Sequence, residues 1–355
     1  AKEMASHLLE LSGRTVLRNI KNYNNGLGHP LTVLKLSGEI SYDVAVLEMG
    51  MSTPMNEIRR LCSITPPDVA VELNVLPVHL EHLGSIENIA AAKAELVEGM
   101  KVGGIAVLNA DDPRVLAMEP LANGTAITFG VDTGADVMAS EIKYLRFGET
   151  RFTLTIKGKS SEVNFPLNGR HNILNALAAA AVGYSFGMGV GDIAAGLSSV
   201  ESPPQRGEVL HFSAGFTVIN DSYNSNPAAL LSMTQTLVEG ASKTARTIVV
   251  AGEMLELGDA AADIHLNIGR RAAEIGVNLL IGVQGLAAQI VEGAESAGIA
   301  TRFAVDAEEA GAFLVGEVRA GDVILVKGSR GVRTEKVIDA LFRNFKLEEK
   351  SVATR

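Results

Sequence analysis

Short apolar runs alternate along the chain with longer stretches in which apolar residues recur every three or four positions. In the first half the runs at 15–17, 43–47, 69–73 and 104–108 predict strands. Helical spacing covers 1–11, 30–36 and 86–100, and Ser85 with Asn88 predicts the start of the last of these helices. Repeated strand–helix units predict a mostly parallel sheet with right-handed crossovers.

The period changes between residues 136 and 167, where apolar and polar residues alternate on both sides of Gly158. This pattern predicts a small antiparallel addition. A helix follows at 169–186, and the Pro- and Gly-containing stretch 202–207 predicts a linker. We therefore expect a central domain at 1–202, a hinge at 203–207 and a second domain at 208–355.

The second half repeats the strand–helix alternation with apolar runs at 216–219, 247–251, 279–283, 302–305 and 323–326. It predicts an independent, Rossmann-like open α/β domain. Ligands of such sheets bind at the carboxyl ends of the strands. The polar segments 220–224, 252–254 and 327–330 fall at those ends.

Composition narrows the class of protein. The 355 residues are 47% hydrophobic, enough for two or three domains with real cores. The formal net charge of −10 argues against nucleic acid as a partner but does not exclude nucleotides. The single cysteine, Cys62, excludes an internal disulfide framework and fits a reducing compartment. No apolar run is long enough to span a membrane.

The first half contains three candidate ligand residues, each with a simpler interpretation. Glu48 closes an apolar strand and could hold Mg²⁺, or be an exposed acid at a strand exit. His79 could bind a cation, or be satisfied by the backbone. Lys93 lies among alanines and could be a confined lysine that reacts with CO₂ to form a carbamate, or a solvated helix lysine.

Further candidates come later in the chain. Asn172 and Asn175 lie one helical turn apart, so their amides could meet a purine edge, or Asn172 could cap the helix. Arg206, in the predicted hinge, could clamp a phosphate or be a surface arginine. Asp221 ends a strand and could bind a ribose or an amine, or cap a turn. The sequence contains neither G-x-x-x-x-G-K-[ST] nor G-x-S-x-G, and one cysteine with scattered histidines cannot supply zinc spacing.

Three segments together closely resemble the Mur ligase family, and within it the MurF type. They are 221–227 (DSYNSNP), 252–258 (GEMLELG) with His265 after it, and 327–333 (KGSRGVR). Two others, 169–176 (GRHNILNA) and 74–93, resemble the wider superfamily. The resemblance covers essentially the whole chain. It implies a P-loop-type ATPase domain followed by a C-terminal ligase domain.

The resemblance also implies residue roles. Glu48, His79 and a carbamylated Lys93 would bind two Mg²⁺ ions. Asn172 and Asn175 would contact adenine, and Arg206 and Asp221 would close on the phosphates and ribose of ATP. Asn25 matches an asparagine near the phosphates. The residues that would face the substrate are Tyr223, Asn224, Asn226, Lys327 and Arg330.

By resemblance the protein would be an ATP-dependent ligase of peptidoglycan precursor synthesis. It would add D-alanyl-D-alanine to UDP-N-acetylmuramoyl-tripeptide through an acyl phosphate, as a cytoplasmic monomer without nucleic-acid or membrane partners. Lys93, His79 and Arg206 would be its catalytic residues, and domain closure about 203–207 would complete the site. Two short segments differ from the family pattern. Val78 stands before His79 where alanine is usual, and residues 54–58 read PMNEI where Pro-Gly-Glu-Ile is usual. We expect the family's fold and function to tolerate both differences.

A larger departure lies at the start. The family's Gly-Lys-Thr phosphate loop and its UDP-binding N-terminal domain would precede Ala1, and neither is in this sequence. A helix that starts at residue 1 without a preceding cap also indicates that a segment upstream is missing. Because the phosphate loop is not in the sequence, we expect the chain as it stands not to turn over ATP. Alternatives are a non-catalytic Mur-like binding protein and a sister ligase that adds an amino acid. A dinucleotide-dependent enzyme is disfavoured because no G-x-G-x-x-G follows a strand.

Overall fold

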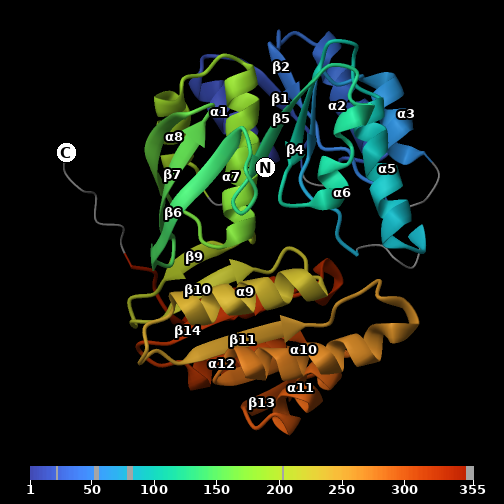
Figure 1. Cartoon of the computed structure of the whole chain (residues 1–355). Coiled ribbons are helices and arrows are strands. Elements are labelled where there is room, and N and C mark those ends of the chain that lie inside the picture. The colour runs from blue at the N-terminus through green and yellow to red at the C-terminus, as the bar shows by residue number, and fades with distance from the viewer. Residues whose placement is uncertain (21–22, 52–55, 78–82, 202–203, 349–355) are drawn as a thin grey trace. The chain divides into compact units, whose positions relative to one another are not determined.

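The computed structural model describes residues 1–20, 23–51, 56–77, 83–201 and 204–348. The chain forms two compact units (Figure 1). The first comprises Ala1–Lys143, Glu149–Pro166 and Arg170–Val200, and the second Tyr144–Gly148, Leu167–Gly169 and Glu201–Arg355. Among the described helices none is long and apolar enough to cross a lipid bilayer.

The first unit contains two sheets. Strands β1 (Val16–Arg18) and β2 (Val44–Val46) form a parallel pair. The other sheet has the order β3-β4-β5-β6-β7-β8. Its strands are β3 (Val69–Glu72), β4 (Ile105–Asn109), β5 (Thr125–Gly130), β6 (Val137–Arg146), β7 (Glu149–Ile156) and β8 (Lys159–Phe165). Strands β3 to β6 pair in parallel and β7 with β8 antiparallel, so the predicted antiparallel addition extends the parallel sheet.

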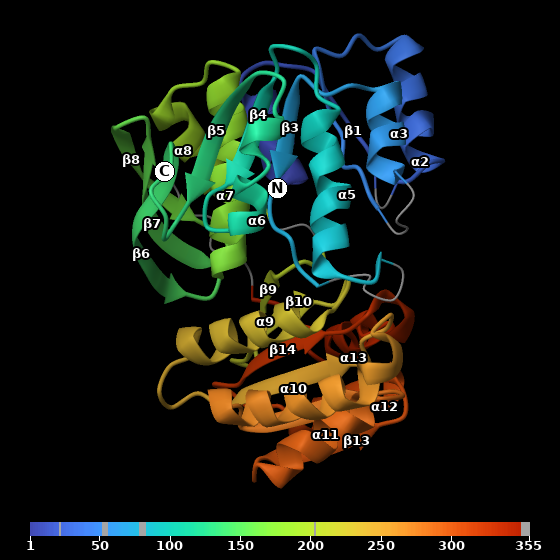
Figure 2. The same cartoon turned by 45° about the vertical axis from the view of Figure 1, so that its right-hand side comes forward.

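Helices cover this sheet because their apolar residues recur with helical spacing. The larger ones are α1 (Lys2–Leu11), α3 (Glu57–Ile64), α5 (Ile86–Glu98), α7 (Arg170–Ser185) and α8 (Val190–Ser198), and the short ones are α2 (Gly28–Val33) and α6 (Pro113–Leu116). Figure 2 shows α5 alongside β3, where Ile89 and Val97 join Ala70 and Leu108 in one buried cluster. Burying such side chains contributes about 1.5–3 kcal/mol each.

The second unit is a doubly covered sheet of order β13-β12-β11-β14-β10-β9. Five strands are parallel: β10 (Thr217–Asp221), β11 (Thr247–Gly252), β12 (Leu279–Val283), β13 (Ala300–Ala304) and β14 (Val323–Lys327). The edge strand β9 (Glu208–His211) runs antiparallel to β10. Every residue of β11, β12 and β14 is buried, as expected of strands covered on both faces.

Alternate strand residues point to opposite faces and build two cores. Ile219, Val249 and Leu280 pack with α9 (Pro227–Gly240), α10 (Ala261–Ile275) and α11 (Ala287–Ser296). Val218, Ile248 and Ile281 pack with α12 (Ala307–Glu317) and α13 (Glu335–Asn344). Figure 2 labels these five helices around the sheet.

The fold class is confirmed: the chain is α/β, with mostly parallel sheets and a mixed edge. Predicted strands match observed ones to within about two residues. Sequence reasoning missed β5, β9, α3, α6 and α8, and placed no strand before residue 216 in the second half. β9 is a short edge strand that directly follows the Pro-rich stretch, where turn signals outweigh strand signals.

Candidate active site

Glu48 lies just beyond the end of β2, and a buried asparagine fixes its backbone. Asn19 is 1% exposed; its side-chain oxygen accepts from the Glu48 N–H at 3.1 Å and its amide donates to the Glu48 carbonyl at 2.9 Å. The Asn19 amide also donates to the Tyr23 carbonyl at 2.9 Å. Satisfying these backbone groups through one buried side chain fixes where the Glu48 side chain leaves the strand.

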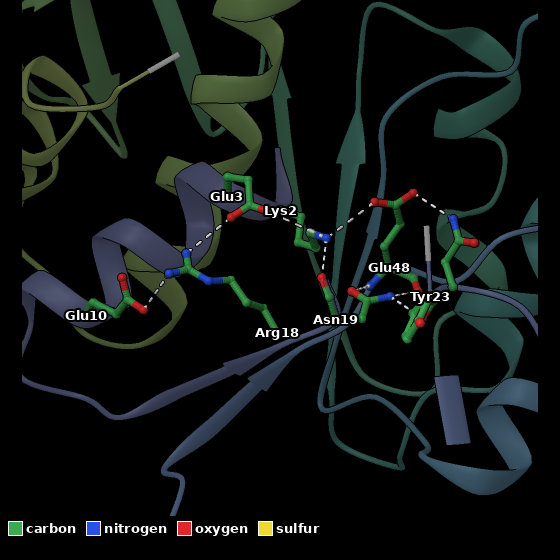
Figure 3. Close-up of polar contacts among 8 residues, drawn as sticks. Lys2, Glu3, Glu10, Arg18, Asn19, Tyr23 and Glu48 are labelled. Atoms are coloured by element: carbon green, nitrogen blue, oxygen red, sulfur yellow. Dashed lines mark hydrogen bonds and ion pairs between the residues drawn. The ribbon is translucent and has the colours of Figure 1, made fainter. Parts of the chain in front are cut away.

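The Glu48 carboxylate is 46% exposed and has two polar neighbours (Figure 3). Asn24 donates to its Oε1 at 2.9 Å, and the Lys2 ammonium lies 3.9 Å from its Oε2. Asn25, the predicted phosphate neighbour, is differently engaged: its side-chain oxygen accepts from the N–H groups of Leu27 and Gly28 at the start of α2. Asn24 is therefore the asparagine of this loop that contacts Glu48.

The donor set at Glu48 suits a hard cation. Mg²⁺ is held in proteins by one or two carboxylates with several waters, and Glu48 offers an exposed carboxylate at a strand end. Within the described residues no group of three His, Cys, Asp or Glu side chains converges as a metal site. His79, the predicted second ligand, lies outside the described residues.

Lys93 has a partner that sequence reasoning missed. Ser85 caps α5 by accepting from the Asn88 N–H, as predicted, and the helix carries Lys93 towards β3. There its Nζ lies 3.1 Å from Oε2 of Glu72, the last residue of β3. The side chains are 22% and 5% exposed respectively. An acid inside the apolar run 69–73 was the available signal, because a buried charge needs a partner.

Burial dominates the titration of Glu72. Desolvation raises its pKa above the ordinary 4.5, Lys93 opposes this by its charge and hydrogen bond, and the charge of Asp112 adds to the rise. A carbamate on Lys93 would put a second negative charge beside this buried carboxylate. The structure thus places the Lys93 ammonium beside a buried carboxylate, and the carbamylation of Lys93 stays a prediction.

Asn172 and Asn175 lie in the first two turns of α7, and both are half-buried. Arg170, at the start of the same helix, forms ion pairs with two aspartates. It donates to Asp111 at 2.8 Å and to Asp132 at 2.6 Å. Burial raises the pKa of Asp111, but N–H groups of residues 131–133 and the charge of Arg170 outweigh it and lower the pKa.

In the second unit, two predicted residues meet as a buried ion pair. Asp221 ends β10 and Lys327 ends β14, and the two are paired in register. Lys327 Nζ donates to Asp221 Oδ2 at 2.6 Å and to the Asn224 carbonyl at 2.8 Å. The side chains are 5% and 17% exposed. β14 lies between β10 and β11, so this pair sits where the strand order reverses, a usual ligand position in open sheets.

Two arginines flank one aromatic ring beside that pair. The Arg206 guanidinium lies over the Tyr223 ring at 4.1 Å from its centroid, and that of Arg330 lies at 5.9 Å. Arg330 also donates to the Gln205 side chain at 3.3 Å. Both guanidinium groups are exposed, and that of Arg330 also pairs with Glu335 at 3.3 Å. A planar guanidinium matches the geometry of a phosphate or carboxylate. Asn226 caps α9 by accepting from the Ala229 N–H.

A buried histidine braces the loop after β11. The His265 Nδ1–H donates to the Ala261 carbonyl at 2.6 Å, leaving Nε2 to accept from the Met254 N–H at 2.9 Å. Gly252 begins this loop against Gly328, where an added Cβ would lie 3.0 Å from the Gly328 Cα and 2.9 Å from Thr334. Close packing of the two strand ends thus requires glycine. His265 therefore has a structural use.

Two surface hollows of about 290 and 660 Å³ lie elsewhere in the first unit. The larger is lined by Leu11, Arg14 and Met188 among others, and the smaller by Lys101 and Phe186 among others. Neither hollow is lined by a predicted site residue.

Two models of known protein families match this sequence. Residues 1–183 match the Mur ligase middle domain, and residues 205–330 match the Mur ligase, glutamate ligase domain. The chain belongs to the Mur ligase family.

Several similar proteins carry the same name. A UDP-N-acetylmuramoyl-tripeptide–D-alanyl-D-alanine ligase of Mycobacterium tuberculosis is 38% identical over 342 residues, covering 90% of this chain and 66% of the relative. The ligase of the same name from Escherichia coli is 34% identical over 352 residues, covering 97% of this chain and 74% of the relative. The crystal structure of MurF ligase from Thermotoga maritima in complex with ADP superposes with a TM-score of 0.85 at 28% identity, covering 97% of this chain and 76% of that one. The chain thus spans about two thirds of the length of the mycobacterial relatives.

Proposed function

We propose that the protein is an ATP-dependent ligase that adds D-alanyl-D-alanine to UDP-N-acetylmuramoyl-tripeptide in the cytoplasm. The observation that carries this proposal is the similarity to ligases of that name across both units. Each unit supplies residues of suitable chemistry. The first unit carries Glu48 after β2, Lys93 on α5 and Asn172 and Asn175 on α7. In the second unit, Asp221, Tyr223, Lys327 and the two arginines lie near the ends of β10 and β14.

The reaction forms an amide from a carboxylate, which is a poor electrophile until an oxygen is turned into a leaving group. A carboxylate oxygen of the tripeptide attacks the γ-phosphorus of ATP, and ADP leaves with the bridging oxygen. The dipeptide amine then attacks the acyl carbon, and phosphate leaves after the amine loses its proton. Positioning and charge neutralisation do most of this work.

On the first unit, Glu48 is the residue we expect to hold Mg²⁺, together with His79. The metal would neutralise phosphate charge when bound. Asn19 and Asn24 orient Glu48 through the bonds described above. Asn172 and Asn175 present amides to the adenine edge. Residues 1–202 would form this ATP-binding domain.

On the second unit, Arg206 is proposed to bind phosphate, since its guanidinium is exposed and held by the Tyr223 ring. Asp221 and Lys327 hold the carbonyl of Asn224 in place, which positions the loop 222–226 for the substrate amine. Arg330 and Asn224 would face the carboxylate end of the dipeptide. Residues 203–207 would act as the hinge before this domain.

Substrate choice tests the proposal. The complete gene product is given ATP, Mg²⁺ and UDP-N-acetylmuramoyl-tripeptide with D-alanyl-D-alanine, D-alanine, L-alanine or D-glutamate, and phosphate release is followed. We expect release with the dipeptide at least tenfold faster than with any single amino acid. Release that is fastest with one amino acid would instead identify a sister ligase. ATP binding without release under any condition would favour a non-catalytic binding protein.

A further inference from the structure

The turn before β9 holds Arg206 by hydrogen bonds to β10 and to the loop after it. Gln205 and Gly207, on either side of Arg206, both have a left-handed backbone, with φ of 63° and 74°. The Tyr223 N–H donates to the Gln205 carbonyl at 3.1 Å, and the Gly207 N–H donates to the Asn220 carbonyl at 3.0 Å. The backbone is therefore fixed on both sides of Arg206, and this residue belongs with the sheet of the second unit.

A polar pair between β9 and β10 supports this turn. Asn220 is 5% exposed and lies opposite Glu208 in the register of the two strands. Its amide donates to Glu208 Oε2 at 3.0 Å, and its side-chain oxygen accepts from the hydroxyl of the buried Ser222 at 2.7 Å. The same Glu208 oxygen accepts from the Gln205 N–H at 3.4 Å. The Glu208 carboxylate thus joins β10 to the first residue of the turn.

Gln205 needs such support because a left-handed backbone is unfavourable for a residue with a Cβ. Its N–H, its carbonyl and its side-chain oxygen each have a partner, namely Glu208, Tyr223 and Arg330. Strained residues persist where their surroundings over-determine them, and they cluster at functional sites. A satisfied polar network is rigid, so it fixes the direction in which the Arg206 side chain leaves the turn.

We propose that Glu208 and Asn220 are positioning residues for Arg206. They hold the turn so that the Arg206 guanidinium lies over the Tyr223 ring, at 4.1 Å from its centroid, before any ligand binds. A guanidinium that is already placed loses less side-chain freedom when it binds a phosphate. The inference rests on the proposed phosphate role of Arg206, but the placement of its side chain can be measured without turnover.

The first measurement is the NMR chemical shift of the Arg206 side chain in the complete gene product labelled with ¹³C,¹⁵N-arginine. Arg206→Lys assigns the signals, and Tyr223→Leu gives their position without the aromatic ring current. We expect Glu208→Ala and Asn220→Ala to move the Arg206 signals most of the way to the Tyr223→Leu position. Glu208→Gln should keep the wild-type position, because its side-chain oxygen can accept the same two hydrogen bonds.

The second measurement is a double-mutant cycle on phosphate release. We expect Glu208→Ala to lower kcat/KM for ATP by about tenfold, and to cause no further loss in a chain that already carries Arg206→Ala. A residue that acts only on stability would cause the same fold-loss in both backgrounds. If Arg206→Ala itself has no effect on turnover, the phosphate role fails, and the NMR shift alone decides the placement.

Glu309→Ala is the matched control. Glu309 accepts from the Val305 N–H at 2.8 Å and pairs with Arg302, whose guanidinium lies over the Phe313 ring. This variant should leave the Arg206 signals and phosphate release unchanged.

Arg206 signals at the wild-type position in both Glu208→Ala and Asn220→Ala would overturn the proposal. If Asn220→Ala loses the native circular dichroism spectrum, Glu208→Ala, which changes an edge strand, decides alone. Where Arg206→Ala is impaired, an equal fold-loss from Glu208→Ala with and without Arg206 would also overturn it.

Discussion

At the scale of single residues, Cys62 shows how burial controls chemistry. It is 2% exposed on α3, and desolvation, with added repulsion from Glu95 and Glu72, raises the pKa of its thiol from 9.0 to about 11. Because the thiolate is the nucleophile, two pKa units correspond to about 100-fold less reactive species below pH 9. As the protein's one cysteine, it is a clean probe of the packing between α3 and α5.

We expect the native protein to react with a thiol-specific disulfide reagent at pH 8 at least about 100-fold more slowly than the same protein in 8 M urea. Labelling is followed by absorbance, and the urea-unfolded chain is the internal reference. Fast labelling of the native protein would show that Cys62 is accessible and that this packing is wrong.

The Lys327–Asp221 pair is the second case at this scale. Removing one member of a buried pair leaves the other charge uncompensated, which costs about 3 kcal/mol or more. We expect Lys327→Ala to lower the free energy of unfolding by about that amount, measured by urea denaturation. Lys336→Ala, which breaks the exposed pair with Glu308, should cost less than about 1 kcal/mol. Equal losses in the two variants would contradict the burial of Lys327.

At the scale of elements, the contact of β3 with α5 makes stability depend on pH. The folded pKa of Glu72 is raised above 4.5, so the folded state binds its proton more tightly than the unfolded state. The resulting stabilisation is fully present below pH 4.5 and is lost as pH rises through the folded pKa. We expect the difference in unfolding free energy between wild type and Glu72→Gln to fall over that window. Glu98→Gln should show no such trend, and a difference that rises with pH would have the wrong sign.

The segment before β9 carries the other element-scale prediction. If Arg206 binds phosphate, Arg206→Ala should lower kcat/KM for ATP by about 100-fold or more while leaving the circular dichroism spectrum unchanged. Arg302→Ala is a matched control. Arg302 lies on β13, and its guanidinium also lies over an aromatic ring, at 5.3 Å from the centroid of Phe313. Near-normal turnover in Arg206→Ala would remove its proposed phosphate role.

Elements with strong periodicity were predictable, and elements set by tertiary pairing were not. The runs at 69–73 and 247–251 became buried strands because a buried strand needs little beyond apolar side chains. Ser85 predicted the start of α5 because its cap is local. β9 is held by its pairing with β10, which no local pattern shows. The pairs Lys93–Glu72 and Lys327–Asp221 likewise join residues 21 and 106 positions apart.

At the scale of the whole molecule, the parallel sheet of the second unit brings its candidate residues together. Parallel strands end at a common edge, so Asp221, Gly252 and Lys327 come together although they are distant in sequence. The residue types at this edge were predictable from sequence alone. Their engagement with each other was not, because it depends on strand order and register. His79 and its role stay a prediction.

The fate of one oxygen atom tests the central claim most directly. The tripeptide substrate is prepared with ¹⁸O in both oxygens of its terminal carboxylate and is ligated to D-alanyl-D-alanine by the complete gene product with ATP and Mg²⁺. Activation as an acyl phosphate predicts one ¹⁸O in each phosphate released and one in the new amide, with ADP unlabelled, read by mass spectrometry. Phosphate without ¹⁸O, or label in AMP, would contradict the proposed ligase chemistry.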